Sequence, residues 1–292
     1  MIIQYIFRDT GEVKTEKPPA ERLIKFLYDN PFGKKAVLPI AKRKFISEWY
    51  GRKMNRPSSI KKIKEFVEDL QIDMTEYQQS ISEFISFNDF FYRKLKPGTR
   101  PIGEGMVSPG DGKLIAFENI SEVGNFFVKG RSFDLAEFLN DESLAESYRD
   151  AAMIILRLAP NDYHRYHFPY DGRPSEAHKI KGKYLSVSPH ALFSNFAKVF
   201  CENKREICTL RTRDKGDVLL IPVGATMVGS IIETYQPDQP VLKGDEMGYF
   251  AFGGSTVVML IDKDKITIDE DLLSNTRNQM ETFVRMGEQI GR

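Results

Sequence analysis

The sequence predicts an α+β fold, with a helical N-terminal portion followed by a β-rich domain. Helical periodicity and basic charge dominate the first 83 residues, whereas short β-forming runs divided by Gly and Asp turns dominate residues 84–292. A chain of 292 residues with 41% apolar residues is also long enough to bury a substantial core. We therefore expect two regions, 1–83 and 84–292.

The N-terminal region contains a cationic amphipathic segment at residues 34–56. It contains eight Lys and Arg residues and a single acid, Glu48. Beside them an apolar stripe is expected, formed by Leu38, Ala41, Phe45 and Trp49. Such a helix can lie in an anionic membrane surface. It can equally pack on the protein's own core and keep a solvated basic face, and the charge pattern alone leaves both readings open.

A second helix is expected after Ser58 or Ser59, either of which can serve as its N-cap. Beyond residue 84, turns at 109–112, 171–172, 215–217 and 243–245 divide short β-type runs. At least one helix is expected to interrupt them, with Ser188 as cap and Pro189 in its first turn.

Composition argues against several classes of protein. A net charge of +1 gives no global field suited to nucleic acid, so no nucleic-acid partner is expected. No apolar run reaches the roughly 18 residues that span a bilayer. The first nine residues are too short and too polar at their end for a signal peptide, so a cytoplasmic protein is expected. Cys201 and Cys208 do not form a metal-ligand spacing, and no role is assigned to them.

The candidate nucleophile is Ser255, which follows Gly253 and Gly254 between dense β-forming residues. Glycine lets another group approach the backbone closely. Ser255 could therefore attack a substrate or the carbonyl of Gly254, its own preceding residue.

The candidate bases are His164 and His167, two of only four histidines in the chain. With Asp162 they could also ligate a metal, but no other Cys or His cluster completes a shell, so no metal is expected. His178 and His190 stand alone and are expected to be surface or helix-start residues.

Asp111, in a Gly-Asp-Gly turn, is the third candidate, although that turn alone is a weak signal. An aspartate that orients a histidine, which deprotonates a serine, is the general logic of an activated hydroxyl. The order here is Asp111, His167 and Ser255. The same residues could serve a serine hydrolase whose chain stays intact, and a non-catalytic lipid-binding module is a third reading.

Several motifs in order resemble the phosphatidylserine decarboxylases, proenzymes of pyruvoyl-dependent lipid decarboxylases. They are FYRKLKPGTRPI at 91–102, SPGDG at 108–112, YHRYHFP at 163–169, NKRE at 203–206, VGATMVGS at 223–230, KGDEMGYF at 243–250 and GGST at 253–256. The last is the Gly-Gly-Ser-Thr form of the family's cleavage tetrad. The N-terminal region is the least covered by this resemblance.

The resemblance implies self-cleavage between Gly254 and Ser255 into chains 1–254 and 255–292. His167, held by Asp111, would take the Ser255 proton. Ser255 would then become a covalent pyruvoyl cofactor that forms a Schiff base with the lipid's amino group. His164 is the candidate that returns a proton after carbon dioxide leaves.

The implied substrate is phosphatidylserine in an anionic membrane, converted to phosphatidylethanolamine. The resemblance also implies a heterodimer of the two chains and a possible dimer of heterodimers. With a lipid substrate, the basic segment 34–56 favours peripheral attachment at the cytoplasmic face of the cell membrane. Residues 1–83 are then a membrane-associating region and 84–292 the catalytic domain. A decarboxylase of an archaeal-type serine ether lipid would share the same site.

Overall fold

A large β-sheet forms the centre of the protein. The computed structural model describes residues 4–15, 49, 51–123, 133–183, 185, 197–224, 230–251, 253 and 255–292. Ten strands of this part join in one sheet, in the order β2-β1-β14-β4-β5-β13-β10-β9-β7, with β8 also paired to β9. The prediction of an α+β fold is confirmed.

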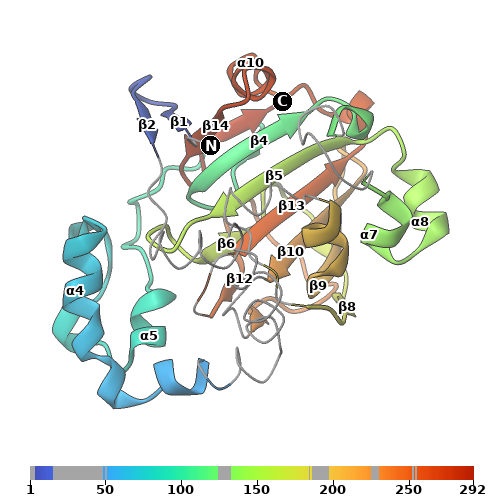
Figure 1. The fold of residues 1–292 in the computed structure, drawn as a ribbon. Helices are drawn as coiled ribbons and strands as arrows, with labels where there is room; N and C mark the ends of the chain where they lie inside the picture. Colours follow the sequence, from blue (N-terminus) through green and yellow to red (C-terminus); the bar gives the residue numbers. More distant parts are fainter. Residues whose placement is uncertain are drawn as a thin grey trace, which may run out of the picture.

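The central strands are long and buried. They are β4 (Gly112–Phe117), β5 (Ala152–Leu158), β9 (Arg205–Arg211), β10 (Asp217–Gly224) and β13 (Ser255–Ile261). Strand β13 lies between β5 and β10 and pairs antiparallel with both (Figure 1). Every residue of β4, β5 and β13 is buried, as expected for near-continuous apolar runs covered on both faces.

The N-terminal residues correct the expectation of a helical region 1–83. Residues 4–15 contain β1 (Gln4–Phe7) and β2 (Val13–Thr15), which pair antiparallel. Strand β1 also lies parallel to β14 (Glu281–Val284), which itself pairs with β4. Alternating aromatic side chains explain this choice, because Tyr5 and Phe7 both pack on Phe283. The beginning of the chain is therefore part of the main sheet.

Two smaller sheets complete the β structure. The first joins β11 (Ile231–Glu233), β12 (Glu246–Phe250) and β6 (Arg165–His167), and the second joins β3 (Met106–Val107) and β15 (Gln289–Gly291). The edge strands β7 (Arg173–Pro174) and β8 (His178–Ile180) both pair with β9. Strand β6 carries His167, so the three-stranded sheet places one candidate base.

Helices lie around the sheet. Those whose bounds lie wholly within the described residues are α4 (Lys61–Asp69), α5 (Phe87–Phe91), α7 (Leu135–Leu139), α8 (Glu142–Ser147) and α10 (Glu270–Arg277). Residues 51–54 and 197–202 are also helical. Short 3-10 turns are η2 (Pro57–Ser59), η3 (Met74–Glu76), η4 (Ile81–Glu83), η5 (Ile120–Glu122) and η6 (Lys263–Lys265). Helices α4 and α5 stand to one side of the sheet (Figure 1) around their own aromatic cluster, which includes Phe84, Phe87 and Phe90.

The capping prediction for the second helix is wrong. Ile60 takes the N-cap position of α4 without a side-chain hydrogen bond. The Ser59 hydroxyl, in η2, instead donates to backbone carbonyls and accepts from the Phe87 amide at 2.8 Å, which joins the turn before α4 to the start of α5. Residues 34–48 of the basic segment, Ser188, Pro189 and His190 lie outside the described residues. Within the described residues, no helix is long and apolar enough to cross a membrane.

Candidate functional site

Ser255 is the first residue of β13. It lies opposite Leu158 of β5 and Gly224 of β10, so the sheet holds its backbone on both sides. Its side chain is fully buried, and its Oγ has no hydrogen-bond partner in the described structure. The same is true of the Thr256 Oγ1. Buried hydroxyls are usually hydrogen-bonded, because an unmade bond costs about 1–3 kcal/mol. Two adjacent hydroxyls without partners at the start of β13 therefore indicate a functional role and not a structural one.

The residues before Ser255 only partly belong to the described structure. Gly253 has a φ of +136°, a backbone conformation that L side chains rarely adopt. Gly254, which supplies the expected cleavage carbonyl, lies outside the described residues.

His164 is fully buried beside this segment. Its Nδ1 lies 2.9 Å from the carbonyl oxygen of Asp162. Because a carbonyl only accepts, Nδ1 carries the proton and Nε2 presents a lone pair. That Nε2 has no hydrogen-bond partner in the described structure. Burial lowers the pKa of His164 to about 3, so the ring is neutral at physiological pH and its Nε2 is unprotonated.

Backbone pairing brings His164 to the cleavage segment. The amide of Phe250, the last residue of β12, donates to the His164 carbonyl at 2.9 Å. Three residues further on, the Gly253 backbone lies near the imidazole and acts to raise its pKa, against the larger effect of burial. Phe91 of α5 covers the ring, with a centroid distance of 3.9 Å. His164 therefore lies between Phe91 of α5 and Gly253, which is two residues before Ser255.

His167 is held differently. Its Nδ1 donates to the Gly244 carbonyl at 2.8 Å, and its Nε2 lies 3.1 Å from the Tyr163 hydroxyl. The Nε2 is thus the basic nitrogen, and Tyr163 donates to it. Burial lowers the pKa of His167, while the charges of Glu246 and Asp111 act to raise it. The tautomer of the His167 ring is therefore set by the Gly244 carbonyl, and not by the Asp111 carboxylate as expected.

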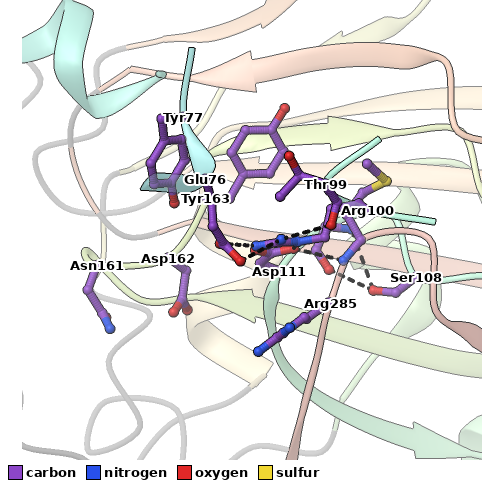
Figure 2. Close-up of polar contacts among 12 residues, drawn as sticks. Glu76, Tyr77, Thr99, Arg100, Ser108, Asp111, Asn161, Asp162, Tyr163 and Arg285 are labelled. Carbon is purple, nitrogen blue, oxygen red and sulfur yellow. Dashed lines mark hydrogen bonds and ion pairs between the residues drawn. The ribbon is translucent and has the colours of Figure 1, made fainter. Parts of the chain in front are cut away.

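Asp111 pairs with Arg100. Arg100 Nε and Nη2 donate to its carboxylate at 3.1 and 2.7 Å, and the Met286 amide donates at 2.8 Å. The other side of the guanidinium binds Glu76 at 2.7 Å, so Arg100 lies between two carboxylates (Figure 2). Burial of both Arg100 and Asp111 makes this a structural ion pair as well as a source of charge near His167.

Asp111 lies near His167 in the fold, but the three expected relay residues do not form one hydrogen-bonded chain among the described residues. The backbone amide of His167 donates to the Pro109 carbonyl at 2.8 Å, two residues from Asp111. Among the described residues, however, no hydrogen bond joins Asp111 to His167 or either of them to Ser255.

Asp162 has a structural partner. Its carboxylate receives Lys113 Nζ at 2.8 and 2.9 Å and the Ala159 amide at 2.7 Å. Both members of the ion pair are 3% exposed, so the pair is shielded from solvent. Across the described ranges, no group of three or more His, Cys, Asp and Glu side chains could hold a metal ion.

Sequence reasoning missed the basic partners of this site. Arg93, 1% exposed, donates to the Tyr77 hydroxyl and to the carbonyls of Asn161 and Asp162, which joins the segment after α5 to the histidine run. Arg93 and Arg100 both lie in the 91–102 motif, which was a usable signal. The partner of Lys113 is 49 residues away, and no local pattern connects the two.

Comparison with known proteins agrees with the motifs. The sequence profile of a family described as phosphatidylserine decarboxylase matches residues 87–292. The chain belongs to this family. It is 55% identical to a phosphatidylserine decarboxylase proenzyme of Fusobacterium nucleatum subsp. nucleatum, over 99% of this chain and 97% of that protein.

Two further relatives carry the same name. A protein of Clostridium botulinum (strain Alaska E43) is 45% identical over 99% of both chains, and one of Desulfitobacterium hafniense (strain Y51) is 44% identical over 99% of this chain and 98% of that protein. The family resemblance therefore extends through the N-terminal residues that its profile does not cover.

Proposed function

We propose that this protein is a self-processing, pyruvoyl-dependent decarboxylase that converts phosphatidylserine to phosphatidylethanolamine and carbon dioxide. One observation carries the proposal: the Ser255 hydroxyl is buried and unpaired at the start of β13, directly after two glycines. A serine in a water-excluded site with no competing partner is suited to attack its own preceding carbonyl. Membership of a family whose relatives are named proenzymes supports the same reading.

The cleavage converts one peptide bond into two chain ends. Ser255 Oγ attacks the Gly254 carbonyl carbon, the peptide C–N bond breaks, and the acyl group moves from nitrogen to oxygen. Loss of the Ser255 α-proton and departure of the Gly254 carboxylate then leave dehydroalanine. Addition of water releases ammonia and leaves a pyruvoyl group at position 255. The resulting chains are 1–254 and 255–292.

His167 is the proposed base for the Ser255 proton. Its Nε2 is the unprotonated nitrogen, and the nearby Asp111 charge favours the imidazolium that forms. His164 is proposed to handle the later proton at the decarboxylated carbon. Because the pKa of His164 is about 3, its ring is neutral at physiological pH. The ring must therefore be protonated at Nε2 before it can deliver a proton to that carbon.

Burial at position 255 also suits the pyruvoyl cofactor. When present, this group supplies an electron sink for the electrons left by carbon dioxide. Ser255 is completely buried, so the surrounding strands exclude bulk water from a reactive carbonyl at this position.

The two chains are expected to remain together as a heterodimer. All of β13 would belong to the small chain, yet it pairs along its whole length with β5 and from Ser255 to Leu260 with β10, both of the large chain. We further propose peripheral attachment to the cytoplasmic face of the cell membrane through the basic segment 34–56. Charge reversal at Lys42, Arg43 and Lys44 should then remove salt-sensitive binding to anionic vesicles, and unchanged binding would contradict this attachment.

Intact-mass analysis of freshly purified protein tests the proposal. The expected result is two chains, the smaller having 38 residues (292 − 254) and a start without a free amine. Ser255→Ala should remain at 33.5 kDa, whereas Ser147→Ala, on the exposed side of α8, should process normally. An intact wild-type chain whose Ser255 reacts with a serine-directed reagent would instead indicate a hydrolase.

A further inference from the structure

A cavity of about 270 Å³ opens beside His167. One wall comes from the segment after α5, including Lys94, Lys96 and Arg100, and the other includes Tyr163 and His167. The cavity therefore lies between the 91–102 motif and the 163–169 motif that contains His167. The cleavage steps use neither this space nor its two lysines.

The uncompensated charge of the cavity wall is positive. Arg100 is neutralised by Glu76 and Asp111, and Glu246 on the opposite wall is paired with Arg165 at 2.8 Å. Lys94 and Lys96 are exposed, and neither forms an ion pair with a carboxylate of the described residues. The Lys96 ammonium donates only to the Thr75 carbonyl at 2.8 Å.

Two adjacent loops carry exposed aliphatic side chains near this cavity. Ile102, which lines the cavity, is 44% exposed, and Leu242 is 66% exposed. The loops are joined because Lys243 Nζ donates to the Gly103 and Gly105 carbonyls at 2.7 and 3.1 Å. The carboxylates of Asp171 and Asp245 accept the Lys243 and Leu242 amides, which stabilises this turn.

We propose that the cavity receives the anionic head group of a phospholipid, with Ile102 and Leu242 touching the bilayer at its mouth. Cationic side chains beside exposed aliphatic ones match the chemistry of an anionic membrane surface, where each Lys or Arg adds attraction. The lipid tails stay in the bilayer while the phosphate and carboxylate meet Lys94 and Lys96. This inference rests on the proposed function, since it names the site at which that function's substrate docks.

The test uses the wild-type protein and processed variants. Lys94→Gln/Lys96→Gln should weaken binding to phosphatidylcholine vesicles containing phosphatidylserine by about thirtyfold, at roughly tenfold for each 1.4 kcal/mol and about 1 kcal/mol per lysine. Its KM for vesicle-borne phosphatidylserine should rise while kcat changes much less. Lys263→Gln/Lys265→Gln, in the exposed turn η6, is the matched control and should behave as wild type.

The aliphatic contact has its own control. Ile102→Ser/Leu242→Ser should weaken vesicle binding, whereas Val13→Ser, at a residue of similar exposure (47%) on β2, should not. Wild-type vesicle affinity and KM in both the lysine and the aliphatic variants would overturn the proposal. If wild-type protein fails to self-cleave or to decarboxylate, the proposed function fails independently of this site.

Protection of Lys94 from amine acetylation separates the two sources of phosphate. Phosphatidylserine vesicles should protect Lys94 in the wild-type protein, and inorganic phosphate at the same total phosphate concentration should not. Protection by inorganic phosphate alone would overturn the lipid assignment and leave a free-anion site.

Discussion

The two histidines of the 163–167 run lie in contrasting surroundings. Around His167, Tyr163, Gly244, Asp111, Arg100 and Glu76 supply partners for one another's polar atoms. In His164, its neighbour Arg93 and the first two residues of β13, four buried polar atoms lack hydrogen-bond partners in the described structure: His164 Nε2, Arg93 Nε, Ser255 Oγ and Thr256 Oγ1. Because each such atom costs stability, the difference indicates a paired supporting side and an unpaired reactive side.

The largest expected effect comes from separating the two histidines. His167→Ala should slow self-cleavage by about 10²–10⁴-fold, the usual contribution of a general base, whereas His164→Ala should cleave and then lose turnover. Time-resolved intact mass and carbon dioxide release measure the two steps. His178→Ala, exposed on β8, is the control.

The reverse outcome would exchange the roles assigned to the two histidines. If His164→Ala blocks cleavage and His167→Ala permits it, the unpaired nitrogen near Gly253 is the cleavage base, and His167 belongs to the supporting side.

Removing Arg100 should cost about 3–5 kcal/mol of unfolding free energy, because it leaves the buried Asp111 carboxylate unpaired. Arg100→Met should be measured by chemical denaturation in the Ser255→Ala background, where the chain stays in one piece. The exposed Arg149→Met should lose at most about 1 kcal/mol. Adding Asp111→Asn should recover part of the loss; no recovery would mean that the pair is not the cause.

Gly244→Ala should have a smaller effect, about 1–3 kcal/mol, and should also disturb the carbonyl that orients His167. The φ of Gly244 is +89°, and an added Cβ would lie 2.7 Å from Ile102 Cδ1. Gly216 has a φ of +67° with open space around it, so Gly216→Ala measures the backbone strain alone. Equal losses in stability and equal cleavage rates would show that the crowding has no effect on His167.

The smallest expected effect concerns unpaired oxygens outside the site. Glu206 Oε2 and Glu233 Oε1 are both buried without a hydrogen-bond partner in the described structure, although Glu206 Oε2 lies 3.8 Å from Lys179 Nζ. Burial, then the neighbouring Glu206, raises the pKa of Glu233 to about 7. The folded protein therefore keeps a proton that the unfolded chain releases near pH 4.5. Stability should fall as pH rises from about 4.5 to about 7.

Glu233→Gln removes this titration. The variant should match wild type near pH 4.5 and be more stable above pH 7, as measured by thermal or chemical denaturation in the Ser255→Ala background. Glu142→Gln, exposed on α8, supplies the control. A variant that gains nothing above pH 7 would show that this carboxyl is already ionised without cost.

Local patterns predicted much of the fold. Short β-type runs divided by turns predicted a β-rich domain after residue 84, and such runs became β5 and β13. The helical expectation failed for residues 4–15, where the strands depend on β14, more than 260 residues away in the chain. Periodicity reports a segment's preference, whereas a parallel strand partner far along the chain is a tertiary choice.

The sequence by itself determined the family and the candidate residues, because its motifs are local runs whose order along the chain is specific. Only the tertiary structure decided which groups pair: Asp111 with Arg100, Asp162 with Lys113, and His167 with Gly244 and Tyr163. The physical reason is that a buried charge or ring nitrogen takes the nearest compatible partner in space. That proximity is set by strand register and helix packing, which the spacing of residues along the chain does not encode.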